Sequence, residues 1–314
     1  MKSAGIIGSG SWALALSKVL KQKNLVIKSR DLKKAKKLFS KTNNIRLTDT
    51  FVDLRNCKYI FLAIPSQSMR ENLNLLKKSF YDTKKVFIIC SKGIEQKTNK
   101  LMSEVLNDFF PDNKFAILSG PNFSFEVIEG LPTASVLSSH DTQIAKNISQ
   151  IILQERFRTY FNKDIIGTQI GGTMKNVVAI ACGLILGKGL GNNAIASVIT
   201  RGLSETVELG LKMGAKRNTF YGLSGIGDLT LTCFSLKSRN TKFGYYLGKS
   251  LSFSKIKKKN ILAEGLESCE SICKLGKKLN VELPICNSVK NIINGVDIKK
   301  TTNDLLSRPL QFEK

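Results

Sequence analysis

The chain has 314 residues, of which 49 are Lys or Arg and 24 are Asp or Glu, so its formal net charge at pH 7 is +25. Hydrophobic residues make up 42% of the composition, which excludes a disordered or fibrous chain. A prior of roughly 150 residues per domain predicts about two domains. The single histidine, His140, excludes a zinc site with two His ligands and disfavours histidine-based catalysis. We expect His140 to be an exposed loop residue.

Cysteine use and hydropathy indicate a cytoplasmic protein without membrane insertion. The seven cysteines are odd in number and form no Cys-x-x-Cys pair, which is typical of reduced thiols in the cytosol. The N-terminus leads directly into a short apolar strand, so we expect no signal peptide. The most apolar region, residues 165–187, is interrupted by Lys175. Its longest uncharged run is shorter than the roughly 18 residues that a bilayer requires.

Strands and helices alternate in the first half of the chain. We expect strands at residues 2–7, 24–29, 58–64, 85–90 and 114–119, with shorter extended segments at 133–138 and 156–161. Helical spacing of apolar residues predicts helices at 12–22, 31–40, 67–79 and 96–109. This alternation is typical of a parallel sheet.

From residue 165 onward the strand pattern ends. The spacing of apolar residues there predicts helices at 167–188, 193–213, 216–222, 240–250, 261–279 and 285–294. We therefore expect a domain boundary near residue 165.

A glycine-rich loop joins the first strand to the first helix. Residues 8–13 read Gly-Ser-Gly-Ser-Trp-Ala and match the pattern G-x-G-x-x-G/A. The first glycine permits a tight turn, the second lets a pyrophosphate approach the backbone, and a small third residue allows close helix packing. We therefore predict an α/β fold with an N-terminal Rossmann-type parallel sheet at residues 1–165, which binds a dinucleotide. We also predict an all-α C-terminal domain at residues 166–314, which binds the substrate.

The residues after the second strand are expected to contact the adenosine ribose of the dinucleotide. They read Ser29, Arg30 and Asp31. An Asp can accept a hydrogen bond from the 2′-hydroxyl of NAD, whereas an Arg can pair with the 2′-phosphate of NADP. Because both residues are present, the sequence leaves the choice open, with a preference for NADP or for both cofactors.

Three explanations account for the positive charge: nucleic-acid binding, attraction of small anionic ligands, or lysine enrichment from an AT-rich genome. The lysines occur in scattered pairs and triplets that fall on expected helix faces and loops. No aromatic ladder interleaves with them as base stacking would require. We therefore expect solvated faces and no nucleic-acid partner.

Eight short motifs follow one another along nearly the whole chain. They are Gly-Ser-Gly-Ser-Trp at 8–12, Ile-Pro-Ser at 64–66, Ser-Lys-Gly-Ile-Glu at 91–95, Ser-Gly-Pro-Asn-Phe at 119–123, Gly-Gly-Thr-Met-Lys-Asn-Val at 171–177, Gly-Ile-Gly-Asp-Leu-Thr-Leu-Thr-Cys at 225–233, Ser-Arg-Asn at 238–240 and Ala-Glu-Gly at 263–265. In this order and at these spacings the chain resembles the bacterial NAD(P)-dependent glycerol-3-phosphate dehydrogenases. Ala13, Asn122 and Ser124 depart from the pattern of that family.

The resemblance implies an oxidoreductase that interconverts dihydroxyacetone phosphate and sn-glycerol 3-phosphate with NAD(P)H and supplies phospholipid synthesis. It implies Lys175 as the general acid and base. The residues implied to hold the substrate are Lys92, Gly120, Asn122, Lys175, Asp228, Ser238, Arg239 and Asn240. Those implied to contact the cofactor are Gly8, Gly10, Ser11, Trp12, Arg30, Lys92, Ser124, Arg239, Leu262 and Glu264. A homodimer is a possible assembly.

Two lysines also stand out by their surroundings. Lys175 lies in an apolar helical segment, where an amine is costly to bury unless it is paired or functional. Lysine is the best proton donor that this chain offers to a carbonyl that is being reduced. Lys92 follows an expected strand, and the carboxyl ends of parallel strands face the ligand crevice. The structural alternatives are a lysine that extends from the end of a core helix and a lysine in a surface turn.

Polar residues of the second half suit an alcohol and a phosphate. Asp228 follows Gly225 and Gly227 and is expected to hold the ammonium of Lys175, to accept from a substrate hydroxyl, or to cap a helix. Residues 238–240 read Ser-Arg-Asn at the start of a helical segment, which suits a phosphate monoester. A polar cap with a solvated Arg is the structural alternative. From spacing alone, Glu264 would be an exposed helix residue.

Two other functions remain open at this point. A different two-domain β-hydroxyacid dehydrogenase would share the fold, but its carboxylate substrate would not need the Ser-Arg-Asn motif. A basic nucleic-acid-binding protein with a Rossmann fold would show steeply salt-dependent retention on nucleic acid and no stabilisation by NAD(P)H.

Overall fold

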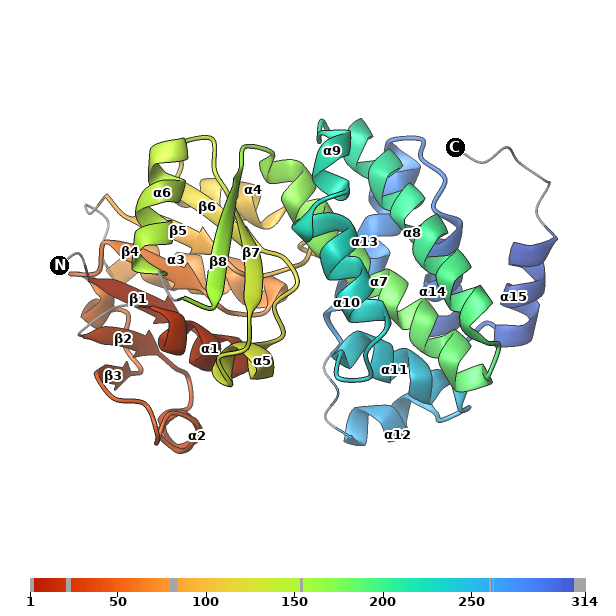
Figure 1. The fold of residues 1–314 in the computed structure, drawn as a ribbon, viewed down its shortest axis with the longest axis horizontal. Helices are drawn as coiled ribbons and strands as arrows, with labels where there is room; N and C mark the ends of the chain where they lie inside the picture. Colours follow the sequence, from red (N-terminus) through yellow and green to blue (C-terminus); the bar gives the residue numbers. More distant parts are fainter. Residues whose placement is uncertain are drawn as a thin grey trace. The chain divides into compact units, whose positions relative to one another are not determined.

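The computed structural model describes residues 3–20, 24–79, 84–152, 155–259, 261 and 263–307 (Figure 1). The chain divides into two compact units. The sheet unit comprises the described residues of 1–92 and 100–165, and the helical unit comprises residues 93–99 and those from 166 onward. The first unit is α/β and the second is helical, so the predicted fold class is confirmed. The grouping of residues 93–99 with the helical unit was not predicted.

Eight strands of the described residues form one sheet in the sheet unit, in the order β3-β2-β1-β4-β5-β6-β7-β8. They are β1 (Ala4–Ile7), β2 (Leu25–Lys28), β3 (Ile45–Thr48), β4 (Tyr59–Leu62), β5 (Val86–Ile89), β6 (Lys114–Ser119), β7 (Thr133–Ser138) and β8 (Phe157–Asn162). Every neighbouring pair is parallel except β6 and β7, which are antiparallel. The strand order reverses between β1 and β4. Ligands of such sheets bind at the carboxyl ends of the strands beside this point.

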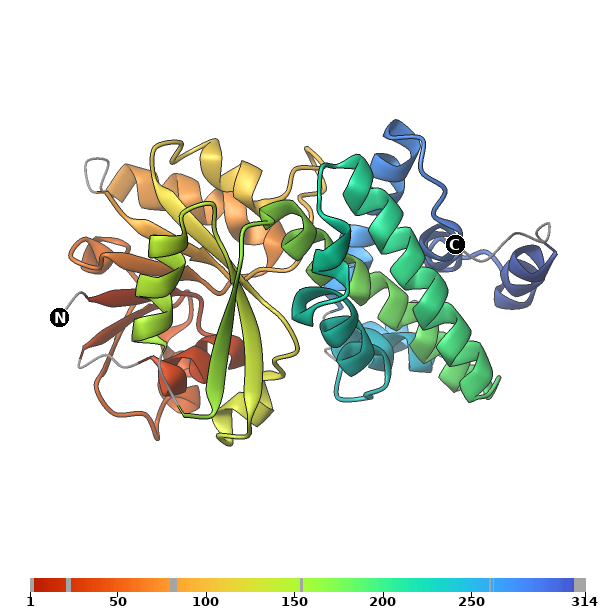
Figure 2. The ribbon, with the colours of Figure 1, turned by 45° about the horizontal axis from the view of Figure 1, so that its top comes forward.

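Helices cover both faces of this sheet (Figure 2). Successive strand residues point to opposite faces, so Ile6 and Phe61 pack on one side while Ile7 and Leu62 pack on the other. The first face is covered by α1 (Ser11–Val19), α5 (Ser124–Ile128) and α6 (Thr142–Ile151). The second face is covered by α3 (Met69–Ser79) and α4 (Met102–Asn107). The short helix α2 (Leu32–Leu38) follows β2.

The helical unit is built around α7 (Ile165–Lys188). This helix is long and apolar enough to cross a membrane, but most of its apolar stretch is buried inside the protein, as in the core helix of a globular unit. The elements that follow are α8 (Asn192–Lys212), α9 (Arg217–Phe220), the π-type turn η3 (Leu223–Gly227), α10 (Asp228–Cys233), α11 (Arg239–Gly248), α12 (Phe253–Lys258), α13 (Glu264–Lys278), α14 (Pro284–Ile293) and α15 (Ile298–Leu306).

Glycines bring α11 against α7. A Cβ atom on Gly183 of α7 would lie 2.0 Å from the carbonyl oxygen of Thr241, and one on Gly244 of α11 would lie 2.0 Å from the carbonyl oxygen of Ile180. Gly187 and Gly248 make the same kind of backbone contact one turn further on. The two backbones therefore touch, and the start of α11 is held close to the middle of α7.

Several elements differ from the sequence-based expectations. The predicted helix at 96–109 was wrong in its first turns, because only Met102–Asn107 is helical. The side chain of Gln96 donates to the carbonyl oxygen of Glu267 in α13, and Asn99 adopts a positive φ of 56°. The edge strand β3 and the helices α5, α6, α10, α12 and α15 were not predicted. Most of these are short, so their packing rather than a long apolar repeat determines them.

Candidate active site

The glycine loop of the sheet unit has the shape that a dinucleotide requires. Gly8 has a φ of +112°, and a Cβ atom there would lie 2.2 Å from the carbonyl oxygen of Ala63. Gly10 is the N-cap residue of α1, lacks a side-chain cap, and has nothing within 4 Å of where a Cβ would lie. The backbone at the start of α1 is therefore open to an anion, and the helix dipole favours one there. These residues fit the pyrophosphate of NAD(P)H.

The remaining residues of the loop agree with this role. Ser11 and Trp12 form the first turn of α1 and are half-buried. Ala13, in the third position of the fingerprint, is fully buried in the core beneath the sheet. A larger side chain at position 13 would push the helix away from the strand, so Ala serves as well as Gly.

The end of β2 separates the roles of Arg30 and Asp31. One carboxylate oxygen of Asp31 accepts the backbone N–H of Lys34 at 2.9 Å and so caps α2. Arg30 is exposed. Ser29 is buried, and its hydroxyl bonds to that of Ser9 in the glycine loop at 2.7 Å. An engaged carboxylate beside an exposed guanidinium favours a ligand that carries a phosphate at this position.

Lys92, Gly120 and Asn122 meet at the ends of β5 and β6, as their predicted common role requires. The ammonium of Lys92 donates to the carbonyl oxygen of Gly120 at 3.0 Å and to Oδ1 of Asn122 at 3.2 Å. The amide of Asn122 donates in turn to the hydroxyl of Ser135 at 3.0 Å. Gly120 has a φ of +128° and lies against the backbone of β7. Ser124 begins α5 in the next turn of chain and is half-buried.

The central feature of the helical unit is a buried ion pair. The Nζ atom of Lys175 in α7 lies 2.6 Å from Oδ1 of Asp228 at the start of α10. Their side chains are only 9% and 1% exposed. The hydroxyl of Thr232 accepts a second hydrogen bond from Lys175 at 2.9 Å. Burial of the pair is costly unless its geometry is good, so a buried, hydrogen-bonded pair of this kind points to function.

Two glycines allow this pair to form. A Cβ on Gly171 of α7 would lie 2.3 Å from the carbonyl oxygen of Ser224, so the η3 turn contacts the α7 backbone directly. Gly225 has non-helical backbone angles, and a Cβ there would lie 2.1 Å from the carbonyl oxygen of Phe220. The chain bends at Gly225 and directs Asp228 toward Lys175, as predicted, whereas Gly227, the second glycine of the motif, has ordinary helical angles.

A second network surrounds the Ser-Arg-Asn motif. The amide of Asn240 donates to Oδ1 of Asn176 at 2.9 Å, and its Oδ1 accepts the backbone N–H of Gly265 at 3.0 Å. Ser238 is the N-cap of α11, and its hydroxyl accepts the backbone N–H of Thr241 at 3.3 Å. Arg239 follows in the first turn and is exposed. The motif is thus both a helix cap and an open cationic site.

Two members of these networks, Thr232 and Asn176, were not predicted from the sequence. Thr232 lies one helical turn after Asp228, a spacing at which both side chains reach the same face of α10. Asn176 directly follows Lys175, and its amide is turned toward α11. Glu264, the first residue of α13, is half-buried rather than exposed. Leu262 lies outside the described residues.

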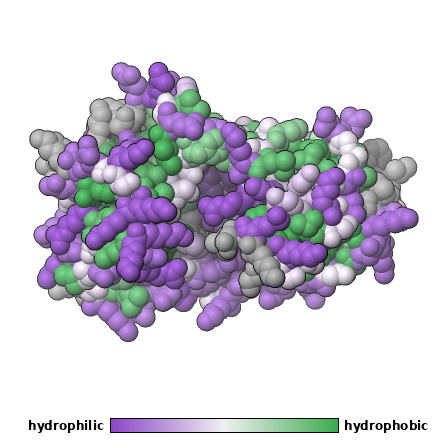
Figure 3. All heavy atoms as spheres, turned by 90° about the horizontal axis from the view of Figure 1, so that it is seen from below, coloured by the Kyte–Doolittle hydropathy of each residue, from purple (hydrophilic) through white to green (hydrophobic). Residues whose placement is uncertain are grey.

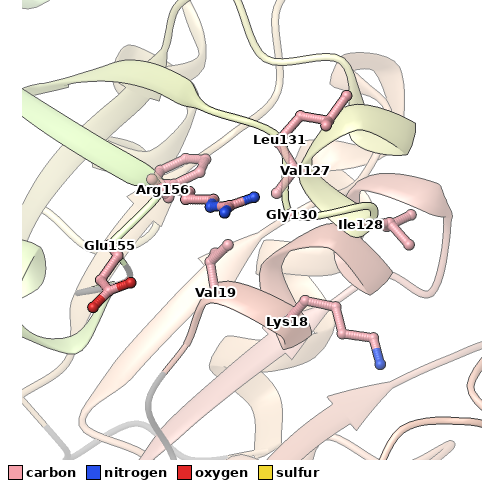
Figure 4. Close-up of a pocket in the computed structure, with 9 residues that line it drawn as sticks. Lys18, Val19, Val127, Ile128, Gly130, Leu131, Glu155 and Arg156 are labelled. Carbon is pink, nitrogen blue, oxygen red and sulfur yellow. The ribbon is translucent and has the colours of Figure 1, made fainter.

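Other parts of the described chain show no competing site. Among these residues no three His, Cys, Asp or Glu side chains are arranged to hold a metal ion. His140 is exposed, as predicted. A hollow in the sheet unit is lined by Lys18, Val127 and Arg156 together with their neighbours (Figure 4). Lys18 lies in the last turn of α1, at the opposite end of that helix from the glycine loop, so the hollow is separate from that loop.

Comparison with known proteins identifies relatives over the whole chain. The family model for the NAD-dependent glycerol-3-phosphate dehydrogenase N-terminus matches residues 3–145, and that for the C-terminus matches residues 164–303. Glycerol-3-phosphate dehydrogenase [NAD(P)+] of Zymomonas mobilis is 38% identical over 98% of this chain and 94% of that protein. The Caulobacter vibrioides enzyme of the same name is 37% identical over 99% of both chains. The crystal structure of glycerol-3-phosphate dehydrogenase from Coxiella burnetii has a TM-score of 0.92 at 31% identity and covers 98% of this chain and 99% of that one.

Proposed function

The chain belongs to the NAD-dependent glycerol-3-phosphate dehydrogenase family, and on this premise we propose that Lys175 is the general acid and base of its reaction. The protein is an oxidoreductase that uses NAD(P)H and interconverts dihydroxyacetone phosphate and sn-glycerol 3-phosphate. The buried contact between Lys175 and Asp228, at 2.6 Å, carries the proposal.

The proton chemistry follows from this contact. Bound NAD(P)H supplies a hydride to C2 of the ketone, so negative charge develops on the carbonyl oxygen. The ammonium of Lys175 stabilises this charge and donates a proton to the oxygen. Asp228 keeps the ammonium charged in its buried position, and Thr232 fixes its direction. In the reverse reaction the neutral amine of Lys175 accepts the proton from the C2 hydroxyl.

The phosphate of the substrate requires a cationic and hydrogen-bonding site. We assign it to Ser238, Arg239 and Asn240 at the start of α11. Arg239 supplies a planar guanidinium and the helix start supplies backbone N–H donors, which together suit a phosphate monoester. A carboxylate substrate of another β-hydroxyacid dehydrogenase would not need this phosphate site. Lys92, Gly120 and Asn122 are assigned to the substrate as well. They lie together at the ends of β5 and β6, where Lys92 donates hydrogen bonds to the other two residues.

The cofactor residues are assigned to the sheet unit and to the start of α13. Gly8, Gly10, Ser11 and Trp12 would hold the pyrophosphate, and Arg30 would hold a 2′-phosphate. Lys92, Ser124, Arg239, Leu262 and Glu264 are the further cofactor contacts that we propose from the family pattern. Because Asp31 is engaged as a helix cap, we propose that NADPH is preferred over NADH.

The experiment that tests the assignment of Lys175 is a Lys175→Ala variant assayed with dihydroxyacetone phosphate. A general acid typically contributes about 10²–10⁴-fold, so we expect kcat to fall by at least about 10²-fold. The dissociation constant of NADPH, measured by fluorescence titration, should stay within about twofold, because the glycine loop is unchanged. A variant with the kcat of the natural enzyme would refute the role of Lys175.

We further propose that the enzyme works in the cytoplasm, supplies phospholipid synthesis and forms a homodimer without a nucleic-acid partner. The family supports the metabolic role, and the buried, unpaired state of all seven cysteines agrees with a reducing compartment. Analytical ultracentrifugation tests the dimer. Retention on immobilised DNA at physiological salt would contradict the absence of a nucleic-acid partner.

A further inference from the structure

One stretch of the helical unit carries positive charge without any acidic residue. Residues 229–263 contain eight Lys or Arg residues and no Asp or Glu. Elsewhere some exposed lysines contact acidic side chains, as Lys100 does with Asp108 and Lys114 with Asp141. Within residues 229–263 the sequence itself offers the lysines no carboxylate. This stretch includes α11 and α12, which contact each other.

Lysine and tyrosine side chains share one face of α11. Lys242, Tyr245, Tyr246 and Lys249 follow the spacing i, i+3, i+4 and i+7, which places them on one side of the helix. Both lysines are exposed and both tyrosines are half-buried. The ammonium of Lys249 lies 5.8 Å from the ring centre of Tyr245, and that of Lys259 lies 5.2 Å from the ring centre of Tyr246.

An exposed aromatic residue lies beside these lysines. Phe253 at the start of α12 is 41% exposed, and its ring packs edge-on against the buried ring of Phe243 in α11, with centroids 5.2 Å apart. Ile256 is fully buried and anchors α12. Lys255, which precedes Ile256 in the chain, and Lys259, which follows it, are both exposed. We call Lys242, Tyr245, Tyr246, Lys249, Phe253, Lys255 and Lys259 the basic face.

We propose that the basic face docks the enzyme on the surface of an anionic lipid bilayer. Figure 3 views the molecule from below, the side on which Figure 1 shows α12, and hydrophilic side chains there are interspersed with apolar patches. Each Lys or Arg near the surface of an anionic bilayer contributes about 1 kcal/mol, which strengthens binding by about fivefold. Tyrosine rings with one apolar and one polar end suit the membrane–water interface, and an exposed Phe can enter the headgroup layer.

The same residues are poorly suited to nucleic acid. Stacking of bases requires open aromatic ring faces. Here Lys249 and Lys259 lie over Tyr245 and Tyr246, and these two rings meet at an angle of 63° rather than forming a stack. Part of the ring of Phe253 is taken up by its contact with the ring of Phe243. A bilayer needs only the cations and the exposed apolar edge, so it is the surface that this arrangement matches.

The test is co-sedimentation of the full chain with vesicles of phosphatidylcholine alone or mixed with phosphatidylglycerol. The test variant is Lys249→Glu/Lys255→Glu/Lys259→Glu. The matched control is Lys36→Glu/Lys37→Glu/Lys146→Glu, which changes three exposed lysines of the sheet unit and gives the same net charge. None of these six residues is assigned to substrate or cofactor, so both variants should keep the reductase activity. This readout also separates the proposal from the proposed function, because vesicle binding does not depend on catalysis.

We expect the natural chain and the control to bind the anionic vesicles and to be released by salt, with no binding to phosphatidylcholine alone. The test variant should bind them at least about 100-fold more weakly, and Phe253→Ser should weaken binding without a change in charge. Equal loss in the test variant and the control would show a general charge effect and overturn the proposal. It would also be overturned by absence of vesicle binding, or by retention on RNA that only the test variant loses.

Discussion

The hydroxyl of Thr232 accepts a hydrogen bond from the ammonium of Lys175 at 2.9 Å and donates one to the backbone carbonyl oxygen of Asp228 at 2.6 Å. Its single proton is directed along the helix, so its lone pairs face the ammonium. Thr232 therefore connects both partners of the buried ion pair and restricts the direction in which Lys175 can point.

Replacement of Thr232 should therefore affect catalysis more than cofactor binding. Thr232→Val keeps the shape but removes the acceptor, and a hydrogen bond to a charged group is worth about 1.5–3 kcal/mol. We expect kcat to fall by roughly 10–100-fold, with the KM for NADPH unchanged. Thr232→Ser, which retains the hydroxyl, should keep most of the activity. Equal kcat values for the Val and Ser variants would contradict this role.

Removal of the charge of Asp228 should destabilise the protein. Asp228→Leu leaves the buried ammonium of Lys175 without its carboxylate, and breaking one side of a buried pair costs about 3–5 kcal/mol. The double variant Lys175→Met/Asp228→Leu removes both charges, so we expect it to be more stable than Asp228→Leu alone. Urea denaturation of the three proteins measures the difference, and a double variant less stable than Asp228→Leu would argue against an unpaired charge as the cause.

Arg30 should determine the preference between cofactors. Arg30→Ala removes the guanidinium that would pair with a 2′-phosphate, so we expect the KM for NADPH to rise by roughly 10–100-fold and that for NADH to change little. Asp31→Ala is the matched control, because Asp31 caps α2. It should lower stability by about 1 kcal/mol and leave the ratio of the two KM values unchanged. A change in that ratio would instead place the Asp31 carboxylate on the ribose.

Glu205 should make stability depend on pH. Its carboxylate lies buried in α8 and accepts the backbone N–H of Ile285 at 2.5 Å and of Cys286 at 3.2 Å, at the start of α14. Burial raises the pKa of Glu205 to about 7, and these backbone donors offset only part of that shift. Between about pH 4.5 and 7 the folded chain holds a proton that the unfolded chain has lost, so stability should fall as the pH rises through this window.

The pH dependence caused by Glu205 can be measured by comparing variants of Glu205 and of Glu208. The difference between the folded and unfolded pKa values corresponds to a loss on the order of 3 kcal/mol across the window. Glu205→Gln should be free of this pH dependence in urea denaturation. Glu208→Gln, on the same helix but half-exposed, should retain it. If the free energy of unfolding of Glu205→Gln falls between pH 5 and 7 as much as that of the natural chain, another group is responsible.

Local patterns were sufficient for the fold class and for part of the site. The glycine loop was predictable because Gly8 and Gly10 occur at a fixed spacing between a strand and a helix, and backbone geometry depends on adjacent residues. Lys175 was recognisable as a cation in an apolar helical segment. The contact of Lys92 with Gly120 and Asn122 was foreseeable from the strands that they follow, since the carboxyl ends of parallel strands lie on one edge.

The sequence by itself therefore determined the class of each unit, the dinucleotide loop and the identity of the buried amine, because each rests on residues close together in the chain. Only the tertiary structure decided that Asp31 caps a helix, that Asn240 bonds to Asn176 and Gly265, and that residues 93–99 group with the helical unit. The contacts of Asn240 and the grouping of residues 93–99 depend on residues tens of positions apart in the chain. The cap at Asp31 depends on which of several available donors its carboxylate binds. Competition among such partners is settled by packing, which no local pattern records.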